Sequence, residues 1–127
     1  MIINKSIDIE DEVRQVLSEH MTAYCRPLPA DYALPNILIT QVGGTERDTI
    51  DTFGIVLDSR AATEAAALDC LNTAVGILKK AAKEQTYALR HVVVNSSGSW
   101  GMDPVRPDLA MCSARVEITA HQTKTEV

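Results

Sequence analysis

Apolar residues recur at helical spacing in two parts of the chain. The segment 8–21 carries one apolar stripe, formed by Ile9, Val13, Val16, Leu17 and Met21. The alanine-rich segment 60–84 repeats aliphatic residues every three or four positions, and Asp58 or Ser59 could cap it. Both stripes have the period of an amphipathic helix, so we predict helices at 8–21 and 60–84. Gly76 lies inside the second helix, where we expect it to allow close packing against a neighbouring element.

Four other segments alternate between apolar and polar residues, which is the pattern of half-buried β-strands. They cover residues 36–42, 49–58, 87–95 and 109–121. The alternation is most regular in the last segment, where one face consists of Ala110, Cys112, Ala114, Val116, Ile118 and Ala120. Gly43-Gly44 marks a turn between the first two segments, which we expect to pair as an antiparallel hairpin.

The predicted elements follow one another in the order αββαββ. Two hairpin-like pairs of strands favour an α+β fold with a mostly antiparallel four-stranded sheet and two helices packed on one face. The chain has 127 residues, so we predict a single domain over 1–127, with frayed termini at about 1–6 and 122–127. Such a sheet has two unpaired edges unless a partner chain covers them.

Two loops separate the predicted elements. A proline-rich linker joins the first helix to the first strand, and a second long loop covers about 95–108. A loop of this length in a small domain is usually functional or mobile. It holds the only tryptophan, and we predict that Trp100, Met102 and Arg106 form a protein interface. The alternative is that Trp100 folds back onto its own sheet.

The composition narrows the classes of partner. The formal net charge is −5, and the basic residues are scattered apart from Lys79, Lys80 and Lys83. These three lysines fall near a predicted helix end, where cations complement the carbonyl dipole. The chain therefore lacks the basic surface of a nucleic-acid-binding protein, and we predict no direct sequence-specific nucleic-acid binding.

The cysteines and histidines are dispersed. Cys25, Cys70 and Cys112 include no closely spaced pair, and Cys70 and Cys112 occupy apolar positions. We predict free cysteines in a reducing compartment, with no metal and no cofactor. No stretch approaches the roughly 20 apolar residues of a membrane span, and the opening residues lack a signal-peptide core. We therefore expect an intracellular protein without a membrane partner.

The usual signatures of catalysis are missing from the chain. It contains no dinucleotide-binding, phosphate-binding, zinc-protease or serine-hydrolase motif. We predict that the protein is not an enzyme. Two other classes remain open: a small oligomeric enzyme whose inter-subunit site combines His91, Asp51 and Arg115, and a monomeric host adaptor or toxin-neutralising protein.

Several segments together resemble the tail terminator, or tail completion, proteins of siphophage-type bacteriophages and prophages. The resemblance covers roughly residues 8–121 and rests on order, length and junctions. Its segments are IEDEVRQVLSEHM, ALPNILITQVGG, IVLDSRAATEAAALDCLNTAVGIL and ARVEITAH. It implies an α/β subunit that forms a ring, commonly a hexamer, at the head-proximal end of the tail tube. A head–tail connector of similar size is the alternative within the same class.

The resemblance also implies partners and a location. A tail terminator ring stops polymerisation of the tail tube protein and presents a surface to head completion proteins. It has no catalytic residues and no cofactor. Such a subunit is found in the cytoplasm of the bacterial host during assembly and then in the tail or neck of the virion.

Overall fold

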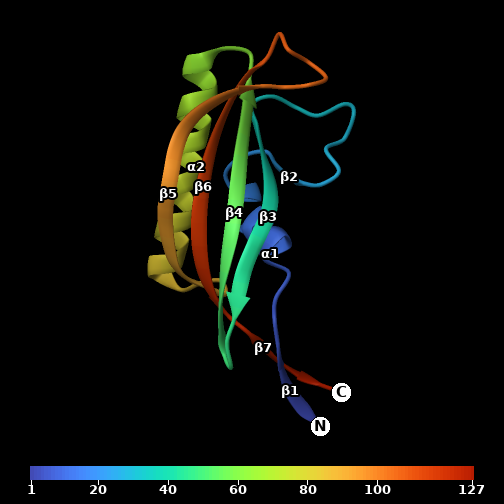
Figure 1. Ribbon diagram of the computed structural model, residues 1–127, viewed down its shortest axis with the longest axis vertical. Helices are drawn as coiled ribbons and strands as arrows, with labels where there is room; N and C mark the ends of the chain where they lie inside the picture. Colours follow the sequence, from blue (N-terminus) through green and yellow to red (C-terminus); the bar gives the residue numbers. More distant parts are fainter.

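The computed structural model describes residues 1–127 and contains two helices and seven strands in two sheets (Figure 1). The elements are β1 (Ile2–Lys5), α1 (Ile9–Ser18), β2 (Ala23–Cys25), β3 (Asn36–Glu46), β4 (Ile50–Ala61), α2 (Glu64–Glu84), β5 (Leu89–Met102), β6 (Ala110–His121) and β7 (Thr123–Glu126). The five-stranded main sheet has the order β2-β3-β4-β6-β5. β1 and β7 form a separate two-stranded ribbon.

The predicted fold class is wrong, because the main sheet is mixed and has five strands. β2 runs parallel to β3, and every other neighbouring pair is antiparallel. β2 could not be predicted from the sequence, because a strand of three residues is too short to show alternation and this one leads into a proline-rich segment. β1 and β7 were predicted to be frayed, yet they pair with each other over four residues each.

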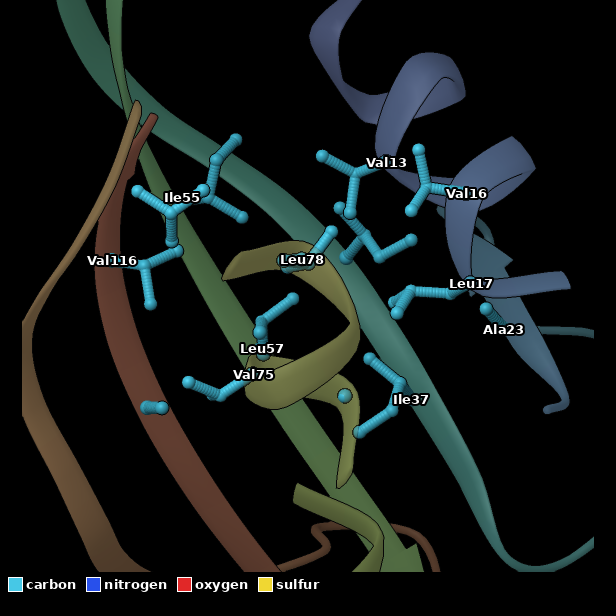
Figure 2. Packing of buried hydrophobic residues seen from close by; sticks show 14 of the residues in the cluster. Val13, Val16, Leu17, Ala23, Ile37, Ile55, Leu57, Val75, Leu78 and Val116 are labelled. Atoms are coloured by element: carbon cyan, nitrogen blue, oxygen red, sulfur yellow. The ribbon is translucent and has the colours of Figure 1, made fainter. Parts of the chain in front are cut away.

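Both helices lie on one face of the main sheet, and the hydrophobic core fills the space between them (Figures 1 and 2). α1 packs over β2 and β3, and α2 packs over β4, β6 and β5. Val13 and Leu17 of α1 meet Leu78 of α2 above Ile37 and Leu57 of the sheet (Figure 2). Because helices cover only one face, the other face of the sheet is open to solvent.

α2 begins later than the sequence suggests. β4 continues through Ala61, and the N-cap is Thr63, whose side chain accepts a hydrogen bond from the backbone N–H of Ala66. Ser59, one of the predicted caps, instead lies buried in β4, where its hydroxyl donates to the carbonyl of Ala67. Gly76 is exposed, and a methyl group added there would meet no atom within 4 Å. The prediction that Gly76 allows close packing is therefore wrong.

β5 is much longer than predicted. It continues through residues 95–102, which were assigned to a loop, and only 103–109 connect it to β6. The polar stretch SSGSWG disguises this strand because β5 is irregular: its register against β6 shifts three times, between Leu89 and His91, Val94 and Ser96, and Ser97 and Ser99. Each shift breaks the period of two on which recognition of a strand depends.

Candidate protein-interaction surface

The predicted interface residues lie at the end of β5 and in the short loop that follows it. Trp100 is 49% exposed, Met102 is 69% exposed and Val105 is 84% exposed. We call these three residues the apolar tip. Arg106, also predicted for the interface, follows Val105 in the sequence and is exposed. Its Nη2 lies 3.0 Å from Oδ2 of Asp108, with which it forms an ion pair.

The register of the sheet shows how Trp100 comes to be exposed. Trp100 lies opposite Cys112, whose side chain is buried on the helix-covered face, so Trp100 points to that same face. Cys112 in turn lies opposite Ser59 of β4, and the hydroxyl of Ser59 donates a hydrogen bond to the carbonyl of Ala67, near the start of α2. Trp100 is on β5, the edge strand of the main sheet, and about half of its surface stays in contact with solvent. Neither of the two sequence-based alternatives describes it fully, since Trp100 lies on its own sheet and also remains accessible.

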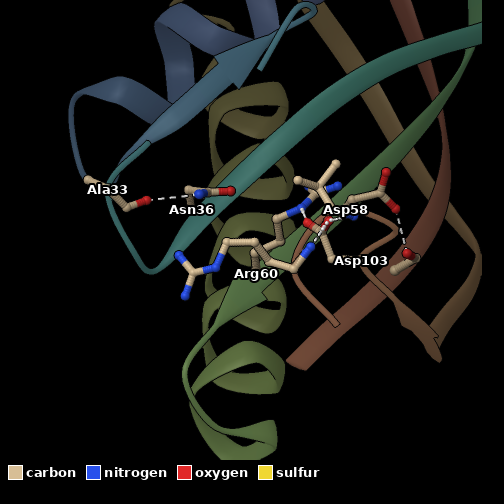
Figure 3. Close-up of polar contacts among 8 residues, drawn as sticks. Ala33, Asn36, Asp58, Arg60 and Asp103 are labelled. Carbon is tan, nitrogen blue, oxygen red and sulfur yellow. Dashed lines mark hydrogen bonds and ion pairs between the residues drawn. The ribbon is translucent and has the colours of Figure 1, made fainter. Parts of the chain in front are cut away.

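A buried ion pair holds the loop that carries the tip (Figure 3). Nε of Arg60, near the end of β4, donates to Oδ2 of Asp103 at 2.6 Å. Oδ1 of Asp103 accepts hydrogen bonds from the backbone N–H groups of Val105 and Arg106, at 2.9 and 3.1 Å. Both charged side chains are almost fully buried. Residues 103–106 are therefore fixed to the sheet, and the position of Val105 follows from that of Asp103.

The same contacts set the charge state of Asp103. Burial by itself would raise the pKa of Asp103. The hydrogen bonds from Arg60, Arg106 and Val105, together with the guanidinium charge, outweigh burial and lower the pKa below its ordinary value. The carboxylate is consequently ionised near neutral pH. One guanidinium nitrogen of Arg60, Nη1, is buried without a hydrogen-bond partner, so Asp103 is the only charged group that compensates Arg60.

The three residues of the alternative enzyme site do not come together within one chain. Asp51 is buried on the helix-covered face of β4. Arg115 and His91 occupy the open face, where Arg115 lies opposite Ser96 and His91 lies opposite Thr119. The alternation of β4, β5 and β6 thus separates the Asp51 carboxylate from the side chains of His91 and Arg115 by the thickness of the sheet.

Two hollows mark the surface. The larger, about 410 Å³, lies between the C-terminal ends of α1 and α2 and is lined by Val16, Glu19, His20, Ile77, Lys80, Ala81, Glu84, Thr86 and Tyr87. The hydroxyl of Tyr87 donates to Glu19 there, and this bond raises the pKa of Tyr87. The smaller, about 260 Å³, lies on the open face of the sheet beside Gly44, Gly54 and Arg115.

Hydrogen bonds from side chains at the base of the β1–β7 ribbon attach the ribbon to the main sheet. Asp51 accepts a hydrogen bond from the hydroxyl of Ser6 at 2.6 Å and from Nε2 of Gln122 at 2.8 Å. Asn4 donates to the carbonyl of Asp48 in the β3–β4 turn at 3.2 Å. Burial would raise the pKa of Asp51, but the hydrogen bonds from Ser6, Gln122 and the backbone of Arg47 lower it overall. One buried carboxylate therefore joins both terminal segments to β4.

The remaining sequence-based candidates behave as ordinary side chains of the fold. Cys70 and Cys112 are buried, Cys25 is partly buried, and all three are free thiols. No three His, Cys, Asp or Glu side chains lie close enough together to hold a metal ion. Neither helix has the length and apolar character that crossing a membrane requires.

Neither a protein-family model nor a curated protein matches the chain.

Proposed function

We propose that the protein is a structural subunit of a siphophage-type tail that caps the tail tube as a homomeric ring. The observation that supports this proposal best is the apolar tip. Trp100, Met102 and Val105 are large and apolar, and they are exposed together beside an unpaired strand edge. Tryptophan and methionine are enriched where proteins contact one another, and a fixed scaffold such as the Arg60–Asp103 pair lowers the entropic cost of presenting them.

The edges of the main sheet limit how subunits of such a ring could join. β5 is an edge strand, but three register shifts disturb most of its length. At the opposite edge, β2 covers only Ile37–Ile39 of β3, and the rest of β3 carries a bulge between Gln41 and Gly44. Irregular edges resist pairing with another strand along their whole length. We therefore propose that side chains at the tip, and not a continuous sheet, provide most of the contact.

The experiment that tests the proposal measures capping of tail tubes. The purified protein is added to a polymerising siphophage tail tube protein, and tube lengths are measured by electron microscopy. We expect shorter tubes whose ends carry a ring, and long uncapped tubes with the variant Trp100→Ala/Met102→Ala. Val93→Ala is the matched control, because Val93 is an exposed apolar residue of the same strand on the opposite face. Unchanged tube lengths with the wild-type protein would rule out the capping function.

A further inference from the structure

The ribbon of β1 and β7 has no hydrophobic cover in the isolated chain. All four residues of β1 and three of the four in β7 are exposed. Ile2 is 65% exposed and Ile3 is 36% exposed, and adjacent residues of a strand point to opposite faces. Each face of the ribbon therefore presents an isoleucine to water. A two-stranded ribbon of this length is at best marginally stable by itself, because it buries almost no apolar surface.

The ribbon is nevertheless held in one direction. Ser6 and Gln122, one on each chain segment that enters the ribbon, both bond to the buried carboxylate of Asp51. Figure 1 shows the result: the ribbon projects beyond the lower end of the main sheet, away from the helices. Hydrogen bonds at its base thus aim two exposed isoleucines away from the body of the molecule.

The apolar tip lies at the other end of the long axis. β5 runs upward in Figure 1, and the 103–109 loop that carries Val105 forms the top of the molecule. The ribbon cannot reach the tip of its own chain. We propose that the ribbon of one copy docks on the apolar tip of a second copy, where the isoleucine on one face of β1 packs against Trp100 and Met102, which share a face of β5.

The local geometry at the tip suits a strand of four residues. After the last register shift, Ser99–Met102 pair regularly with β6, and their outer edge has no neighbour. This regular segment has the same length as β1, which is four residues. An added strand could therefore make main-chain hydrogen bonds at this place on β5 while the isoleucine on the matching face of β1 covers Trp100 and Met102. The irregular segment before Ser99 offers no such run.

This contact joins two different surfaces of the same chain, so it is heterologous. Repetition of a heterologous contact closes into a ring when the rotation between copies allows it, and otherwise gives an open filament. The inference rests on the proposed ring and supplies both halves of its interface. It assigns the ribbon an intermolecular role, for which the hydrogen bonds at Asp51 provide the orientation.

The test uses two complementary variants of the full chain. In the ribbon variant, Ile2→Asp/Ile3→Asp, the tip is intact; in the tip variant, Trp100→Asp/Met102→Asp, the ribbon is intact. Size-exclusion chromatography with light scattering measures the mass of each, and far-UV circular dichroism checks that each keeps the secondary structure of the wild type. We expect an oligomer for the wild type and a loss of association for each variant alone. Val93→Asp serves as control and should leave the oligomer intact.

Mixing the two variants is the decisive step. An intact tip on one chain and an intact ribbon on the other leave one functional contact, so the mixture should yield a species of two chains and nothing larger. Absence of that species, a ribbon variant that assembles like the wild type, or a wild type that stays monomeric at about millimolar concentration would each overturn the docking proposal. If the mixture forms dimers but the wild-type protein does not cap tail tubes, the result supports the docking contact and excludes the proposed tail function.

Discussion

At the scale of single residues, the least replaceable interaction is the buried pair of Arg60 and Asp103. Their charged atoms approach to 2.6 Å at a site that solvent hardly reaches. Removing one member of a buried pair leaves the other charge without compensation, which costs far more than loss of a surface pair. Nη1 of Arg60 already lacks a partner, so no second acceptor is in place to take over from Asp103.

We therefore predict that Asp103→Asn destabilises the protein by about 3 kcal/mol. Urea denaturation followed by circular dichroism would measure the loss. Asp108→Asn is the matched control in the same loop, because its partner Arg106 is exposed, and it should change stability little. Equal losses for the two variants would contradict the assigned role of Asp103.

The pair also predicts a dependence of stability on pH. The pKa of Asp103 is lower in the folded protein than its ordinary value of 3.8. The unfolded chain therefore binds this proton more readily, and the contribution of Asp103 is complete above pH about 4 and is lost as pH falls through the folded-state pKa. Asp103→Asn should have a smaller loss of stability between pH 5 and 3 than the wild type, as measured by urea midpoints at each pH. A parallel pair of pH profiles would exclude this explanation.

At the scale of elements, the regular periods of the sequence identify the helices and the buried faces well. Ile37 and Ile39 of β3, Ile55 and Leu57 of β4, and the apolar face of β6 are buried as their alternation predicts. The start of α2 was placed too early because Asp58 and Ser59 have the composition of a cap while continuing β4. Residue propensities alone do not distinguish a serine that caps a helix from one, such as Ser59, whose hydroxyl donates to a backbone carbonyl inside the fold.

The interior of α2 provides a test at this scale. Gly76 is exposed in the middle of a helix of 21 residues, and its position has room for a side chain. Alanine loses less conformational freedom on folding than glycine, so Gly76→Ala should stabilise the protein by about 0.5–1 kcal/mol. Thermal unfolding would show a higher midpoint. A lower midpoint would mean that this face of α2 contacts another chain in the assembled state or that the helix bends there.

At the scale of the whole molecule, the arrangement depends on contacts that are distant in sequence and leave little local trace. The ion pair joins positions 60 and 103, and the ribbon joins the first residues to the last. Neither has a pattern that a single segment reveals. For the same reason the sequence places Trp100 and Met102 on a loop, although both belong to the end of β5, and it gives no sign of the ribbon as a second surface.

Hydrogen exchange can follow the ribbon in the assembled protein. In a monomeric chain its backbone amides have only a four-residue ladder for protection, so residues 2–5 and 123–126 should exchange quickly. In the oligomer we expect these segments to become protected, while β6, paired on both sides, stays protected in both states. The tip variant Trp100→Asp/Met102→Asp should show the fast exchange at every concentration. Slow exchange of the ribbon in that variant would show that the ribbon is stable without a partner.

The irregular edge of β5 has a further consequence for solubility. A long, flat and apolar edge strand is a template on which identical chains stack into fibrils. In β5 the three register shifts, the last of them at Gly98 with its positive φ of 80°, restrict regular pairing to a few residues beside the tip. In the proposed ring, β5 would therefore accept a neighbouring strand over only one short stretch, and the same irregularity would oppose the growth of fibrils.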